Sequence, residues 1–153
     1  MRNLNLIAAT SLFLAAPLLA AAHEGEHFLA GELGDPKQPA RVIKVNMRED
    51  GKKMLFEPAH IIIHKGEQIR FVLFNEGSES HEFVLATFEE NKKHAELMKK
   101  FPKMEHDDPN AKRLTPFTED EIVWKFTKRG TFEYACLIPG HREAGMHGTI
   151  DVK

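Results

Sequence analysis

Hydrophobic and polar residues alternate along much of the chain after residue 40, a pattern typical of half-buried β-strands. In residues 68–74, Ile69, Phe71 and Leu73 fall on one face, and residues 121–127 repeat the alternation. Further strands are expected at residues 41–47, 54–56, 60–63, 81–86, 131–136 and 149–152. Glycine-containing turns separate these segments. Seven or eight short strands at this spacing predict an all-β protein, an antiparallel β-sandwich.

One segment breaks the alternation. Apolar residues recur at helical spacing from Phe88 through Ala95 and Met98 to Phe101, and a proline follows directly. The sequence therefore predicts a helix, followed by a polar loop in which prolines recur. Helix and loop together form an insertion at residues 88–120, laid against the sandwich.

The N-terminus has the features of a secretory signal peptide. Arg2 precedes an apolar stretch, and Ala20-Ala21-Ala22 offers a cleavage site of the A-x-A type. We expect residues 1–22 to be removed, residues 23–40 to form a flexible tail and residues 41–153 to form one domain. Nothing else in the chain is apolar over the length needed to span a membrane, so the mature form is expected to have no span. Export without another sorting feature indicates the bacterial periplasm.

Charge excludes one class of partner. Without Arg2 the chain has 20 basic and 23 acidic residues, a net charge of −3 with neutral histidines, and no basic stripe dominates it. Nucleic acid is therefore not an expected partner.

The chemistry is concentrated near the C-terminus. Cys136 is the only cysteine, His141 follows after four residues, and Met146 follows after four more. A thiolate, an imidazole and a thioether on one loop are most of a soft copper site, and His81, at the start of a predicted strand, supplies a second imidazole. Two histidines and one cysteine in a trigonal array, with Met146 as a weak axial ligand, would make a type 1 centre. The alternatives are a buried core cysteine and a surface histidine.

These residues lie in a context that resembles the cupredoxins, the type 1 copper proteins that include plastocyanins, azurins and rusticyanin. The resemblance covers roughly residues 42–152. It rests on the segment from Phe71 to Asn75 that leads to His81-Glu82-Phe83, and on the Gly130–Cys136 strand that enters the ligand loop. It implies a Greek-key sandwich with His81, Cys136, His141 and Met146 as copper ligands. The ligand spacing is also like that of rusticyanin, and the histidine-bearing N-terminus and the insertion resemble periplasmic cupredoxins linked to bacterial copper tolerance.

The resemblance implies a non-enzymatic periplasmic copper protein that cycles between Cu(I) and Cu(II). We expect it to serve copper tolerance by binding copper and transferring single electrons, with a periplasmic redox partner or a copper-handling protein as its protein partner. The alternative is a dedicated electron shuttle between respiratory partners. Catalysis is not expected, because the four-ligand set leaves no open position for a substrate.

Further copper-compatible residues fall outside the main set. His23 would become the first residue after cleavage and could chelate Cu(II) through its amine and imidazole, with His27 adding a nitrogen. The insertion holds a second group, which consists of His94, Met98, Met104 and His106. The alternatives are a solvated tail and, for Met98, packing of the helix. Additional copper at either place would favour tolerance over a shuttle, which needs one copper.

Two residues near His81 bear on how the site is held. The family often has Asn or Ser directly after the first histidine, whereas this chain has Glu82. Asn75 is expected to bond across to the ligand loop in compensation.

Overall fold

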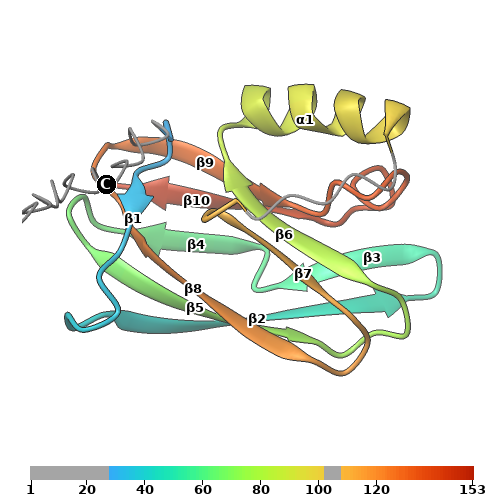
Figure 1. The fold of residues 1–153 in the computed structure, drawn as a ribbon, viewed down its shortest axis with the longest axis horizontal. Helices are drawn as coiled ribbons and strands as arrows, with labels where there is room; N and C mark the ends of the chain where they lie inside the picture. The colour runs from blue at the N-terminus through green and yellow to red at the C-terminus, as the bar shows by residue number, and fades with distance from the viewer. Residues whose placement is uncertain (1–27, 102–107) are drawn as a thin grey trace, which may run out of the picture.

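The computed structural model describes residues 28–101 and 108–153, and these form two five-stranded sheets packed face to face (Figure 1). The first sheet has the strand order β1 (Glu32–Leu33), β8 (Glu119–Lys125), β5 (Gln68–Asn75), β2 (Arg41–Asp50) and β3 (Lys53–Glu57). The second has the order β4 (His60–Ile63), β10 (His147–Val152), β9 (Gly130–Ala135), β6 (His81–Ala86) and β7 (Ala111–Leu114). The predicted β-sandwich is confirmed.

The sheets are mixed rather than purely antiparallel, which corrects the expectation. β2 pairs in parallel with β5, and β4 pairs in parallel with β10, while the other ladders are antiparallel. The chain leaves the first sheet after β3, forms β4 at the edge of the second and returns as β5 beside β2. Parallel neighbours need such a crossover connection.

Two strands lie where none was predicted. β7 falls in the expected loop of the insertion, where it pairs with β6, and β8 already begins at Glu119. β1 falls in the expected flexible tail and pairs with β8. The neighbouring residues are also fixed to the sandwich, because Phe28 packs edge-on against Trp124 and the Trp124 indole Nε1 donates a hydrogen bond to the Ala30 carbonyl at 3.2 Å. The described part of this segment, residues 28–40, therefore contacts the sandwich at β8.

The core between the sheets is built from the inward faces of the strands. Ile69, Phe71 and Leu73 of β5 are fully buried, as their alternation predicted. Aromatic rings link the two sheets, since Phe56 of β3 meets Phe83 of β6 and Tyr134 of β9 edge-on. Burial of this apolar surface supplies the main free energy of folding.

The predicted helix is α1 (Phe88–Lys100), and it lies on the outer face of the second sheet against β6 and β9 (Figure 1). It begins at a capping box, in which Thr87 accepts a hydrogen bond from the backbone of Glu90 and the Glu90 carboxylate accepts one from Thr87 N–H. Met98 is fully buried in a small cluster with Val84, Ala135 and Leu137. β6 is therefore buried on both faces.

Candidate metal centre

Three metal-ligating side chains meet at one end of the sandwich. His81 begins β6, Cys136 follows β9 directly, and His141 lies in the loop that joins β9 to β10, at the right of Figure 1. One ligand atom from each lies within 4.8 Å of the others. His81 Nδ1 is 3.2 Å from His141 Nδ1, which is 3.4 Å from Cys136 Sγ. The two imidazoles therefore turn the same nitrogen toward one thiol.

The loop from Cys136 to Met146 is folded on itself by its own backbone. Cys136 N–H donates to the Met146 carbonyl and Met146 N–H donates to the His141 carbonyl, both at 3.0 Å. Gly140 and Gly145 have φ values of +94° and +107°, in the region that favours glycine. These bonds bring the first and last predicted ligands of the loop side by side. The Met146 side chain is fully buried.

His81 is held from a different direction, by the turn that precedes it. Asn75 accepts a hydrogen bond from Gly77 N–H and donates to the carbonyls of Glu79 and Leu114. The expectation that Asn75 bonds to the Cys136 loop is thus replaced by a role in fixing the His81 turn against β7.

A carboxylate in β2 also contacts this turn. Glu49 Oε1 lies 3.0 Å from His81 Nε2, on the side of the ring away from Cys136. The same carboxylate accepts hydrogen bonds from the backbone N–H groups of Ser78 and Glu79, both at 3.0 Å. Sequence reasoning missed Glu49, because no local pattern reveals which residue of β2 the β5–β6 turn will meet.

The site is buried, and this affects the protonation of Cys136 and His141. Burial raises the pKa of Cys136 to about 12, against a smaller opposing effect of the Glu82 backbone N–H, which donates to Sγ at 3.3 Å. Burial, and next to it the neighbouring His81, lower the pKa of His141. Without metal the thiol is therefore protonated and the His141 ring neutral at pH 7.

The donor set fits a soft transition metal. Metal–nitrogen bonds of about 2.0 Å spread in a trigonal plane would hold two nitrogens about 3.5 Å apart. The two imidazole nitrogens are 3.2 Å apart, which is close to this value. Two imidazole nitrogens and one thiolate suit copper in both its oxidation states. The N–H of Glu82 aimed at the sulfur is a contact that tunes such a centre, and it comes from the backbone, so the Glu82 side chain does not compete with it.

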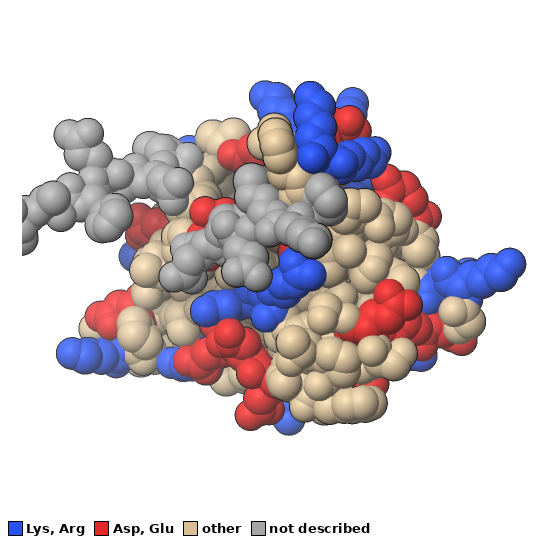
Figure 2. Space-filling view, turned by 45° about the vertical axis from the view of Figure 1, so that its right-hand side comes forward, with Lys and Arg blue, Asp and Glu red and all other residues tan. Residues whose placement is uncertain are grey.

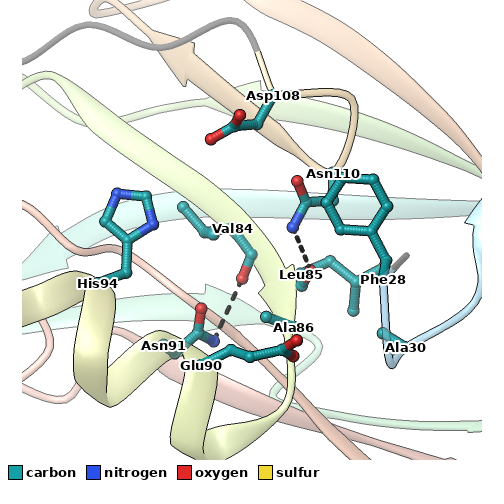
Figure 3. A pocket seen from close by; sticks show the side chains of 10 residues that line it. All are labelled: Phe28, Ala30, Val84, Leu85, Ala86, Glu90, Asn91, His94, Asp108 and Asn110. Carbon is teal, nitrogen blue, oxygen red and sulfur yellow. Dashed lines mark hydrogen bonds between the residues drawn. The ribbon is translucent and has the colours of Figure 1, made fainter. Parts of the chain in front are cut away.

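The remaining predicted copper-compatible residues are not part of this cluster. His23, His27, Met104 and His106 lie outside the described residues. His94 lines a separate pocket of about 170 Å³ between α1 and the segments that include Asn110 and Phe28, as Figure 3 shows. Met98 packs in its apolar cluster instead and is not among the residues that line the pocket.

One face of the molecule can be judged for its charge in Figure 2. On the face seen in Figure 2, basic and acidic side chains are interspersed around an area of uncharged residues.

A two-sheet sandwich with two histidines and one cysteine converging at its end defines a class of small copper proteins. The profile described as "Copper binding proteins, plastocyanin/azurin family" matches residues 43–153. The chain belongs to this family, the cupredoxins, and copper is its metal.

Two relatives give the comparison more detail. The copper-resistant cuproprotein CopI of Rubrivivax gelatinosus is 45% identical over 138 residues, which are 87% of this chain and 82% of that protein. The copper-resistant cuproprotein CopI of Pseudomonas aeruginosa is 32% identical over 178 residues, covering 97% of this chain and 94% of that protein.

Solved structures show the same fold. Auracyanin B has a TM-score of 0.66 at 21% identity, covering 81% of this chain and 96% of that one. A multicopper oxidase from Campylobacter jejuni has a TM-score of 0.56 at 14% identity, with 80% of this chain matching 32% of that one. At such identities the likeness concerns the fold alone.

Proposed function

We propose that this protein is a periplasmic type 1 copper protein that serves copper tolerance, with His81, Cys136, His141 and Met146 as ligands of one copper ion. The convergence of two Nδ1 atoms and one Sγ in a buried cluster carries this proposal. The two relatives described as copper-resistant cuproproteins support the choice of tolerance.

The residues around the cluster suit a site that changes little between oxidation states. Bound copper would supply one-electron chemistry between Cu(I) and Cu(II). The backbone bonds of the Cys136–Met146 loop and the Asn75 contacts hold the donors in place before metal arrives. Four ligands leave no open position for a substrate, so we assign the protein no catalytic role.

Export is part of the proposal. The apolar N-terminal stretch after Arg2 and the alanines before His23 support cleavage behind Ala22. Within residues 28–101 and 108–153, the structure contains no helix that is long and apolar enough to cross a bilayer.

The test is a titration of metal-free protein starting at His23 with Cu(II), following visible absorption and total bound copper together. We expect an intense charge-transfer band that saturates at one copper. Cys136→Ser should abolish the band, and His81→Gln should weaken copper binding strongly. His64→Gln, which alters an exposed histidine outside the cluster, is the matched control and should leave both unchanged.

The same titration separates tolerance from a shuttle. Colourless binding beyond one equivalent would favour tolerance and direct attention to His23, His27 and the insertion. Saturation of both signals at one copper would favour the shuttle. A band that survives in Cys136→Ser would overturn the ligand assignment.

A further inference from the structure

The carboxylate of Glu49 is the one charged group in the described residues that contacts the far nitrogen of His81. We propose that Glu49 is a positioning residue for the copper site. It fixes the His81 ring with Nδ1 toward Cys136, and its negative charge favours the oxidised metal. This inference rests on the proposed function, because it concerns the same four-ligand site.

The contact determines the tautomer of His81. An ionised carboxylate can only accept a hydrogen bond, so the His81 Nε2 atom, 3.0 Å from Glu49 Oε1, must carry the proton. In the neutral ring Nδ1 then has the lone pair, and Nδ1 faces His141 and Cys136. A ligating histidine commonly has its other nitrogen bonded to a carboxylate, a carbonyl or a water in this way.

The carboxylate itself is held firmly. The backbone N–H of Ser78 donates to Oε2 and that of Glu79 donates to Oε1, each at 3.0 Å. The turn approaches so closely that a Cβ on Gly77 would lie 2.5 Å from Oε2. A larger residue at position 77 would require the Glu49 carboxylate to move. Three donors therefore fix one anion from two sides, which is more than a chance surface contact provides.

The charge acts where solvent screens it little. The Glu49 side chain is 20% exposed and His81 is fully buried. The other imidazole has a weaker counterpart, because Glu79 Oε2 is 3.6 Å from His141 Nε2 and its side chain is 57% exposed. A fixed negative charge beside one imidazole makes that ligand a better electron donor and stabilises Cu(II) more than Cu(I). Glu49 should therefore lower the reduction potential, and Glu79 should have a smaller effect.

The first test needs no copper. In the metal-free protein starting at His23, long-range ¹H–¹⁵N correlation spectra of the imidazoles report which nitrogen of His81 carries the proton. We expect the Nε2–H tautomer. An Nδ1–H tautomer in the wild-type protein would overturn the proposal without any variant. This readout stands even if the protein were to bind no copper, which would contradict the proposed function alone.

The second test compares Glu49→Gln with the copper-loaded wild type. Glutamine keeps an acceptor for His81 but removes the charge. We expect the ratio of Cu(II) to Cu(I) affinity to fall by about tenfold, the lower end of the effects of such outer contacts. For a one-electron couple this is a rise of about 59 mV in reduction potential. The visible band should remain.

Glu76→Gln is the matched control, since Glu76 is exposed and lies in the same turn, and its hydrogen bond to the Met47 carbonyl comes from its backbone N–H. Its potential should stay near that of the wild type. An unchanged potential in Glu49→Gln, or equal shifts in both variants, would overturn the role of the Glu49 charge.

Discussion

Burial of the site has its largest chemical effect on the thiol of Cys136. Burial raises its pKa to about 12, well above the range in which proteins work. Copper binds the thiolate, so at pH 7 to 9 binding must release the thiol proton. The lowered pKa of His141 means that its ring, already neutral there, adds none.

We therefore expect one proton to be released for each copper bound between pH 7 and 9, with affinity rising about tenfold per pH unit. Calorimetric titrations in two buffers of different ionisation enthalpy measure this number directly. A value near zero would mean that Cys136 is already ionised in the metal-free protein.

Met146 should tune the copper site rather than create it. In Met146→Leu the buried side chain keeps nearly its volume but loses its sulfur, so we expect copper and colour to remain. Losing the thioether donor in a buried site stabilises Cu(II) less than Cu(I), so the reduction potential should rise. A spectroelectrochemical titration measures this potential. Failure to bind copper at all would show that the thioether is more than a weak axial ligand.

The Asn75 side chain joins the turn before His81 to β7. Asn75→Ala removes three hydrogen bonds in a fully buried place and should lower the free energy of unfolding by about 2–4 kcal/mol in urea titrations of the metal-free protein. Asn46→Ala, at a half-buried position of β2, should cost far less. Equal losses would contradict a special role for Asn75.

Several of the proposed copper ligands and their neighbours could be recognised in the sequence, and others could not. Cys136, His141 and Met146 stand close together in one loop, so spacing alone indicated a soft metal site. Glu49 reaches His81 only through the packing of β2 against the later turn. The Glu82 contact to sulfur uses a backbone N–H, which every residue but proline has, so its side chain carried no information.

The strands follow the alternation of the sequence wherever they are long enough to show it. β5 and β6 were predicted within a residue of their bounds. Buried and half-buried residues alternate along the whole of β5, and β6 is a continuous buried run. β7 has four residues, of which only Leu114 is buried, and β1 has two. Neither shows an apolar pattern, because β7 has a single buried residue and both residues of β1 are exposed, so both were assigned to irregular segments.

Helix α1 gives an element-level test of the second copper hypothesis. Met98→Ala should lower the free energy of unfolding by about 2–5 kcal/mol, since the side chain is fully buried with Val84, Ala135 and Leu137. Met98→Leu should cost less than about 1.5 kcal/mol. Total bound copper should be the same in both variants as in the wild type. A lower copper stoichiometry in Met98→Leu would instead make Met98 a ligand.

The direction of strand pairing belongs to the whole molecule. Alternation in β2 and β5 predicts which side chains are buried, but it is the same for parallel and antiparallel neighbours. The parallel pairs arise because the chain changes sheets between β3 and β4, a choice that no short segment records. Neither the local pattern nor the resemblance to a known fold predicted these two parallel pairs.

The N-terminal segment covers the β8 edge of the first sheet, and its removal should change the environment of Trp124, the only tryptophan. A protein beginning at Arg41 lacks Phe28, Ala30 and β1, which cover or pair around Trp124. Compared with the protein that starts at His23, we expect a lower midpoint of unfolding in urea. We also expect a red-shifted fluorescence spectrum, because Trp124 becomes exposed to solvent. Identical spectra would mean that residues before 41 do not cover the ring in solution.

His81 begins β6 and Cys136 directly follows β9, so the metal site forms only when these two strands have folded. The two residues meet only when β6 and β9 lie side by side in the second sheet, with the β5–β6 turn in place. A partly assembled chain can offer a thiol or an imidazole, but not the trigonal set. The charge-transfer colour would therefore act as a built-in optical probe, appearing in refolding experiments only once β6 and β9 have paired.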